Sequence, residues 1–336
     1  MTKVEIMKNS GYKISPNDRR DFIFSALKPS TVSLPPKFLY PDIEVNEQVI
    51  GDCVGQAARA IKTIQERKNH PKKNLDFAPD FIYSECKKLD GIPNEEGTHP
   101  RVAMKVLQNI GATEKPFYPG LTEHNTRPTP NLETYENAKN YKVKTYAQVE
   151  TVEDMKQALV EEGPILAGVI VTTNFYENKD GWIDLPGGYF LGGHALAITG
   201  YDDNLTHTYP DGTTRKGFFR MINSWGTDWG NKGYAWLPYD YVKFESDLGM
   251  KFFMEAWTSV DVIMPDKDYE PIKPMEEKIT LWVNKKQVIV NGIEVTLDAA
   301  PQIVNGRTLV PVRFISEQLG HKVQWFAGDQ RIEITK

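Results

Sequence analysis

The spacing of apolar residues changes about halfway along the chain, and the change predicts two kinds of structure. After Cys53, apolar or small residues recur every three or four positions, the pattern of a helix with one buried face, at Val54, Ala57, Ala58, Ile61 and Ile64. Prolines predict the starts of two further helices, at Pro79 and Pro100. Later runs are apolar and rich in β-branched residues, which predicts strands at 164–171, 194–200, 217–222, 233–237 and 252–263. Helices followed by strands indicate an α+β fold, with a helical lobe against an antiparallel sheet.

Both ends of the chain are predicted to lie outside this main body, which we assign to residues 35–265. Residues 1–34 are predicted to form an N-terminal arm, because prolines interrupt any long helix there. The short apolar patch of the arm, 22–24, is expected to dock on the body. Residues 266–277 have the proline and charge content of a semi-rigid linker. Residues 278–336 are predicted to form a separate, small α+β domain of short strands with one helix.

Composition and charge narrow the classes of function. The chain has 336 residues, a formal net charge of -5 and no dense basic run, which argues against a nucleic-acid-binding protein. No apolar stretch is long enough to span a membrane, and the first residues lack the apolar core of a secretory signal peptide. The expected location therefore stays open between the cytoplasm and, for a phage-associated protein released by lysis, the cell surface.

The two cysteines are Cys53 and Cys86, too few for a disulfide framework and without metal-ligand spacing, so no metal or other cofactor is expected. Cys53 stands at the amino end of its predicted helix, where backbone N–H groups and the helix dipole lower the pKa of a thiol and favour a nucleophile. The alternative is a buried structural cysteine, which a lone cysteine is more often. Cys86 lies within a helical stretch and is expected to be structural.

A nucleophilic thiolate needs a base, and the base needs a group that orients it. His194 is the candidate base, because it opens a predicted strand directly after two glycines; the alternative is a structural histidine. Asn223 is the candidate orienting group, because its amide oxygen can accept a hydrogen bond from an imidazole. The neighbouring Trp225 ring could shield that bond from water.

Three segments together resemble the papain family of cysteine peptidases. They are GDCVGQA at 51–57, GHALAITGY at 193–201 and NSWGTDWGNKGY at 223–234. The resemblance implies a papain-like two-lobe fold and an enzyme of bacterial or phage type that hydrolyses peptide bonds in protein or peptide substrates. The reaction would pass through an acyl-enzyme.

The resemblance also implies a role for each residue of the site. Cys53 is the nucleophile, His194 its imidazolium partner and Asn223 the orienting group. Gln48 is expected to donate to the oxyanion, although strict counting places Glu47 there, because the loop before the cysteine is one residue shorter than usual. Asp52, directly before the thiol, opposes thiolate formation and predicts a raised pKa for Cys53.

The resemblance further predicts where a substrate binds. Gly97 and Thr98 are expected to pair with the substrate backbone, the alternative being a simple helix-entry loop, and Gly193 and Trp225 are also assigned to substrate binding. The long helical inhibitory pro-region of eukaryotic members does not fit in residues 1–40. The arm is therefore expected to pack on the body and to leave the cleft open.

Residues 278–336 resemble a second family, the copper amine oxidase N-terminal-like domain, an accessory unit of surface proteins in Gram-positive bacteria. The resemblance lies in the turn at 291–292, the segment PQIVNGRTLVPVRFI at 301–315 and the Leu-Gly pair at 319–320. It does not imply copper, since only His321 offers a nitrogen ligand. It implies attachment to the cell envelope or to another protein.

Three functions therefore stay open. The first is an active thiol peptidase. The second is a papain-fold binding protein with impaired catalysis, which Asp52 and the ambiguity between Gln48 and Glu47 favour. The third is a cell-wall amidase of the Cys–His type, which an envelope-binding appendage suggests, although such amidases lack the Asn-Ser-Trp-Gly segment.

Overall fold

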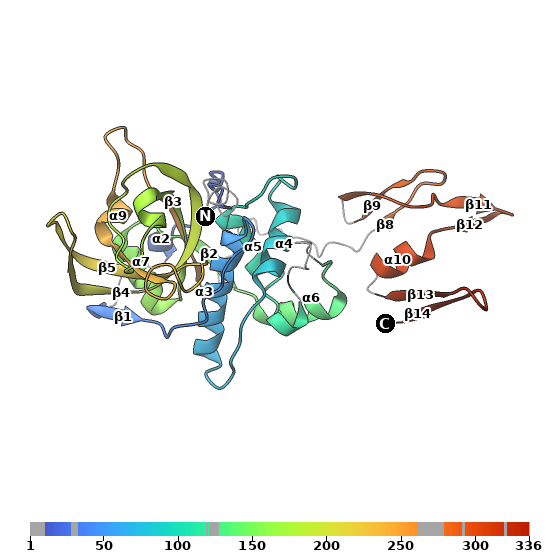
Figure 1. Ribbon diagram of the computed structural model, residues 1–336. Coiled ribbons are helices and arrows are strands. Elements are labelled where there is room, and N and C mark those ends of the chain that lie inside the picture. Colours follow the sequence, from blue (N-terminus) through green and yellow to red (C-terminus); the bar gives the residue numbers. More distant parts are fainter. Residues whose placement is uncertain are drawn as a thin grey trace. The chain divides into compact units, whose positions relative to one another are not determined.

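The computed structural model describes residues 11–27, 33–118, 120, 128–260, 279–290, 293–318 and 321–335 (Figure 1). The chain divides into two compact units near residue 264, with residues 130–133 grouped with the second. The predicted linker, 266–277, lies outside the described residues, and the predicted domain boundaries stay predictions. No helix in the described ranges is long and apolar enough to cross a membrane.

Three helices build one lobe of the first unit, as predicted from the apolar spacing. They are α3 (Cys53–Asn69), α4 (Pro79–Leu89) and α5 (Pro100–Asn109). Proline stands in the first turn of α4 and of α5, where its missing N–H costs no hydrogen bond. Helix α3 is buried along most of its length because it packs against α4 on one side and strand β4 on the other (Figure 1). This burial places the amino end of α3 at the boundary between the two lobes.

The second lobe is an antiparallel sheet in the order β2-β7-β3-β4-β5-β6, with β1 paired to β4. Its strands are β1 (Lys37–Leu39), β2 (Thr145–Gln148), β3 (Ile165–Thr172), β4 (Phe190–Thr208), β5 (Thr214–Ile222), β6 (Tyr234–Pro238) and β7 (Phe253–Val260). Seven of the eight residues of β3 are buried, because β3 lies between β4 and β7. The α+β class predicted from the sequence is confirmed.

Strand β4 is longer than predicted at both ends. His194 lies inside it and does not open it, because Gly193 and Gly192 already pair with Ile170 and Val171 of β3. The segment 202–216, which lies between two of the predicted strands, mostly extends the β4–β5 hairpin. Exposure alternates from residue to residue beyond Asp202, which is the pattern of a strand with one solvated face.

Shorter elements connect and flank these two lobes. They are α2 (Phe24–Leu27), η1 (Lys115–Phe117), α6 (Leu132–Ala138), η2 (Lys139–Tyr141), α7 (Val152–Glu161), α8 (Thr173–Tyr176) and α9 (Tyr239–Lys243). Thr151 caps α7 by accepting from the Asp154 N–H at 3.0 Å. The arm docks on the body through Phe24, which is fully buried, while Phe22 stays exposed.

The described residues from 279 onward form small antiparallel sheets and one helix. Their elements are β8 (Ile279–Thr280), β9 (Gln287–Val290), β10 (Ile293–Thr296), β11 (Gln302–Val304), β12 (Arg307–Leu309), α10 (Val312–Gln318), β13 (Lys322–Phe326) and β14 (Arg331–Thr335). Strands β9 and β10 pair on either side of the predicted turn, whose two residues lie outside the described ones. Asn305 and Gly306 both have positive φ, which fits the tight turn between β11 and β12.

Candidate active site

The three candidate catalytic residues come from three separate elements. Cys53 is the first residue of α3, His194 lies in β4, and Asn223 directly follows β5. Strands β4 and β5 are antiparallel neighbours, so the register brings the last two residues together across the sheet. His194 Nε2 lies 2.6 Å from Asn223 Oδ1, which also accepts from the Ser224 N–H. An amide oxygen only accepts, so Nε2 carries the proton.

This tautomer leaves Nδ1 of His194 as the atom that can accept a proton. Nδ1 is buried and has no hydrogen-bond partner among the described residues. The backbone N–H of Ala195, the next residue, donates toward the sulfur of Cys53, so the thiol borders the strand beside the imidazole. The arrangement provides a thiol, a proton acceptor and a group that orients the acceptor.

Trp225 covers the imidazole, as expected from the sequence. The Trp225 and His194 rings are stacked with centroids 4.4 Å apart, and the Phe175 and Trp229 rings pack against Trp225 in turn. This aromatic cover keeps water from the bond between His194 and Asn223. The role of Trp225 in substrate binding stays a prediction.

Both reacting groups are fully buried, and burial sets their pKa values. Burial raises the pKa of Cys53 to about 12, and the neighbouring carboxylate of Asp52 adds to the rise, while N–H donors from Ala195, Gly11 and Val54 oppose it. The raised pKa predicted from Asp52 is therefore confirmed in direction, with burial as the larger cause. The prediction that the helix end lowers the pKa of Cys53 is wrong for this buried conformation, because desolvation outweighs the helix dipole.

Burial acts on His194 in the opposite direction. It lowers the pKa of the imidazole to about 4, although the hydrogen bond to Asn223 favours the charged form. At neutral pH the pair in this conformation is therefore a thiol and a neutral imidazole.

The group that buries Cys53 is the N-terminal arm. The Thr98 N–H donates to the Gly11 carbonyl at 2.8 Å, and the Lys13 N–H donates to the Thr98 carbonyl at 3.0 Å. Tyr12 thereby forms a parallel bridge with Thr98. The Gly11 backbone lies so close to the loop before Cys53 that a Cβ on it would sit 1.7 Å from the Gly51 carbonyl oxygen.

The expectation that the arm leaves the cleft open is therefore wrong. A long helical pro-region is not needed to cover the site, because a short extended segment pairs with Thr98 and lies over the thiol. Gly97, Thr98 and Gly193, which were assigned to substrate binding, all contact this segment. The arm occupies the surface that these three residues line, and their role in substrate binding stays a prediction.

Sequence reasoning missed two residues of this surface. Tyr12 lies against Gly193, and its hydroxyl donates to the carboxylate of Glu255 in β7 at 2.8 Å. The signal in the sequence was Glu255, a carboxylate between apolar residues near the start of the predicted strand 252–263. A buried carboxylate needs partners, so this position pointed to a polar contact within the fold.

Of the two oxyanion candidates, Gln48 is buried and Glu47 is exposed. The Gln48 amide accepts from the Ser224 hydroxyl at 2.6 Å and donates to the Ile50 carbonyl at 3.0 Å. Glu47 instead bridges Trp225 through its backbone and lies near Gly226. These positions favour Gln48 over Glu47, and its role as an oxyanion donor stays a prediction.

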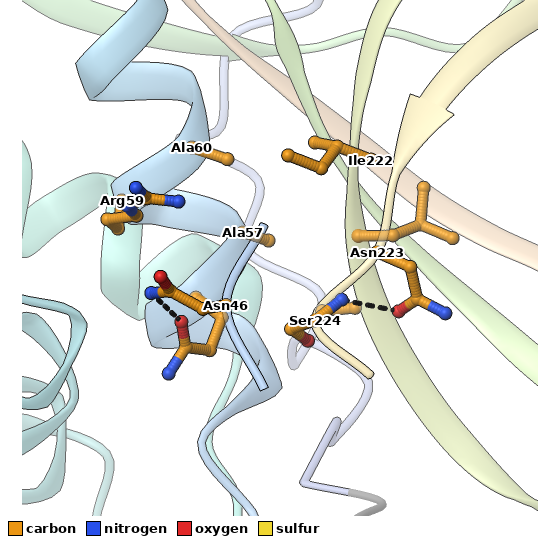
Figure 2. Close-up of a pocket in the computed structure, with 10 residues that line it drawn as sticks. Asn46, Ala57, Arg59, Ala60, Ile222, Asn223 and Ser224 are labelled. Atoms are coloured by element: carbon orange, nitrogen blue, oxygen red, sulfur yellow. Dashed lines mark hydrogen bonds between the residues drawn. The ribbon is translucent and has the colours of Figure 1, made fainter. Parts of the chain in front are cut away.

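A small cavity of about 10 Å³ lies between α3 and the end of β5 (Figure 2). It has room for about one water molecule and is too small for a peptide. Asn46 at its edge donates to Gln56, which in turn donates to the Asp52 carboxylate, both at 2.8 Å. The cavity therefore belongs to the packing between the lobes, and this chain of bonds orients Asp52 within the first turn of α3.

The described residues hold no group of three or more His, Cys, Asp or Glu side chains placed to bind a metal ion. His321 was the nitrogen ligand considered for the second domain. Within the described ranges it is not part of a group of side chains that could bind a metal ion.

Comparisons with known proteins identify both parts of the chain. Residues 51–250 match the family model described as papain family cysteine protease, and residues 264–334 match the copper amine oxidase N-terminal domain. An uncharacterized peptidase C1-like protein of Acanthamoeba polyphaga mimivirus is 26% identical over 85% of this chain and 98% of its own length. Cathepsin B-like cysteine proteinase 3 of Ostertagia ostertagi is 30% identical over 31% of this chain and 54% of its own length.

Solved structures point to the same fold. Xylellain, a cysteine protease from Xylella fastidiosa, superposes with a TM-score of 0.63 at 26% identity, over 76% of this chain and 97% of its own. Procathepsin B S9 from Trypanosoma congolense gives a TM-score of 0.57 at 18% identity, over 77% of this chain and 88% of its own, a likeness of fold alone. The chain is thus a papain-like cysteine peptidase of the papain family, with a copper amine oxidase N-terminal domain on the C-terminal side of its peptidase domain.

Proposed function

We propose that the protein cleaves peptide bonds inside protein or peptide substrates through Cys53, His194 and Asn223. The observation that carries the proposal is the 2.6 Å contact between His194 Nε2 and Asn223 Oδ1, which leaves Nδ1 as the only basic atom of the ring. Because the thiol borders the same strand, Nδ1 can take its proton.

The first half of the proposed reaction forms the acyl-enzyme. The Cys53 proton moves to Nδ1 of His194, and the sulfur attacks the substrate carbonyl carbon. The Cys53 N–H and the Gln48 amide stabilise the oxyanion. The C–N bond then breaks, the leaving amine takes the proton from Nδ1, and a thioester remains on Cys53.

The second half restores the enzyme. A water molecule gives a proton to Nδ1 and attacks the thioester carbonyl. The C–S bond breaks, the sulfur regains the proton, and the acid product leaves. Asn223 keeps the imidazole in the tautomer that both halves need.

Substrate can reach the thiol only when residues 11–13 have left the cleft, because this segment lies against the fully buried Cys53 and against Gly193, the neighbour of the buried His194. Departure of this segment would rehydrate both groups. Rehydration lowers the pKa of the thiol and raises that of the imidazole, which moves the pair toward the charged, reactive form.

The test is covalent labelling with a peptidyl epoxide, a reagent for nucleophilic thiols. We expect mass spectrometry to find the label on Cys53 once the chain lacks residues 1–15, and no label on the Cys53→Ala form. Cys86→Ala is the matched control, because Cys86 is equally buried but lies in α4. The shortened chain with this substitution should still be labelled on Cys53. If the shortened chain is never labelled and cleaves no protein, the result would support the alternative function, a papain-fold binding protein with impaired catalysis.

We also propose that residues 264–336 attach the peptidase to a cell envelope or to another protein. Large apolar side chains are exposed on this unit, among them Ile303, Leu309, Trp325 and Ile332. Exposed apolar side chains in such number are typical of interaction surfaces.

Co-sedimentation with Gram-positive cell envelopes tests this role. The full chain should sediment and a chain ending at residue 263 should stay in solution, while both keep the same peptidase activity. Equal sedimentation of the two chains would contradict attachment through this unit.

A further inference from the structure

Two side chains of α4 hold the segment 91–98, which ends at the residue that binds the arm. Residues 93–96 are exposed, whereas Gly97 and Thr98 are buried. The Tyr83 hydroxyl accepts from the Gly97 N–H at 2.8 Å, and the Lys87 ammonium donates to the Gly97 carbonyl at 2.9 Å. Both backbone groups of Gly97 are therefore bonded to α4, directly before Thr98.

Lys87 also ties the start of the segment to its end. Its ammonium donates to the Ile92 carbonyl at 2.8 Å and lies 2.7 Å from the carboxylate of Asp90. With the Gly97 carbonyl these make three partners, which matches the three donors of an ammonium. The Lys87 side chain is 11% exposed and that of Asp90 is fully buried, so the ion pair is shielded from water. Both cysteines of the chain are free, so no disulfide ties this segment.

The bond from Lys87 acts on the same peptide unit that binds the arm. The Gly97 carbonyl and the Thr98 N–H belong to one planar trans unit, in which the two groups point in opposite directions. Lys87 holds the carbonyl, and the N–H on the other side donates to the Gly11 carbonyl at 2.8 Å. The ammonium thus fixes the direction of the Thr98 N–H, and its charge polarises the unit and strengthens that donor.

We infer that Lys87 is a positioning residue of the peptidase, which acts through the peptide unit between Gly97 and Thr98. The inference rests on the proposed function, with Thr98 pairing to the substrate backbone once the arm has left. Lys87 touches neither the thiol nor the substrate. It holds in place the N–H that binds first the arm and then the substrate, so its loss weakens both.

The experiment replaces Lys87 by methionine, which keeps the length of the side chain but offers no donor. In a chain without residues 1–15 we expect KM for a peptide to rise about tenfold, the effect of losing about one backbone hydrogen bond, with kcat unchanged. In the full chain the same substitution should speed alkylation of Cys53 by iodoacetamide about tenfold, because the arm is held less tightly. In the shortened chain that alkylation rate should not change, because the reagent does not use Thr98.

Lys88→Met is the matched control, because Lys88 is the next residue of α4 and bonds to Glu85 and Tyr135 in place of this segment. It should change none of these rates. Tyr83→Phe removes only the hydroxyl that holds the Gly97 N–H and should act in the same direction as Lys87→Met, so it decides the question if Lys87→Met does not fold. An unchanged KM, a kcat that falls as much as KM rises, or equal effects of Lys88→Met would overturn the inference.

Peptide binding to the shortened Cys53→Ala chain separates this inference from the proposed function. If Lys87→Met weakens that binding while no peptide is ever hydrolysed, the positioning role stands and the peptidase mechanism fails. If peptides are hydrolysed but their binding does not depend on Lys87, only the positioning role fails.

Discussion

A chain that lacks residues 1–15 is expected to hydrolyse peptides about a hundredfold faster than the full chain. The arm is held by two backbone hydrogen bonds to Thr98 and by the bonds of Tyr12 and Ser15 to Glu255. At about 0.5–1.5 kcal/mol each, these bonds together contribute about 3 kcal/mol or more. With this stabilisation of the covered state, the cleft is open in about 1% of molecules. Removal of the arm should therefore raise the rate of hydrolysis about a hundredfold.

The deletion is chosen to spare the rest of the arm. Asp18 and Asp21 pair with Arg101, and Phe24 is buried in the core, so residues from 16 onward help to hold the fold. Gly11→Ala gives a second route to the same result, because its Cβ would collide with the Gly51 carbonyl and lift the arm. Gly328→Ala is the matched control, since a Cβ there meets nothing within 4 Å.

Thiol alkylation against pH gives an independent measure of arm release. In the covered state burial holds the pKa of Cys53 at about 12, so little thiolate exists at neutral pH. Removal of the arm should lower that pKa, and the inflection in the rate of alkylation by iodoacetamide should move to lower pH. Equal peptidase rates and equal inflections in the full and shortened chains would show that the arm does not restrict the site.

Replacing His194 by alanine in the shortened chain is expected to lower kcat/KM about 10²–10⁴-fold, the usual contribution of a positioned general base. Without Nδ1 the Cys53 proton has no acceptor, and the leaving amine has no acid. Asn223→Ala should cost less, about tenfold to hundredfold, because the imidazole stays but loses the bond that orients it.

His207→Ala is the matched control for this comparison. His207 lies on the same strand and stacks on Trp182 far along the hairpin from the site, so its loss should leave kcat/KM unchanged. Thermal unfolding of each variant checks that the fold is intact. A folded His194→Ala chain that keeps full activity would contradict the proposed mechanism.

Local patterns in the sequence predicted most elements of the fold. The apolar spacing after Cys53 specified α3, and the prolines at 79 and 100 specified where α4 and α5 begin. These predictions succeeded because each depends on residues within a few positions of one another. The length of β4 was underestimated because its outer half is polar and is held by pairing to β5.

The motifs around Cys53, His194 and Asn223 likewise indicated the family and the candidate catalytic residues, because each motif is a short run of neighbouring residues. His194 and Asn223 meet because β4 and β5 are neighbours in the sheet, and their bond is the one expected from the Asn223 amide oxygen as an acceptor. The direction of the Cys53 pKa shift needed the fold, because the position of a residue on a helix does not reveal how deeply the thiol is buried.

The sequence by itself determined the helical and sheet lobes, the second domain and the chemistry available at the site. Only the tertiary structure decided that the arm covers that site and that Tyr12 meets Glu255. The two residues are separated by 243 positions, and no local pattern links them. Their contact depends on the slot that Gly168 and Gly193 leave open when β3 and β4 pair, which is a property of the assembled sheet.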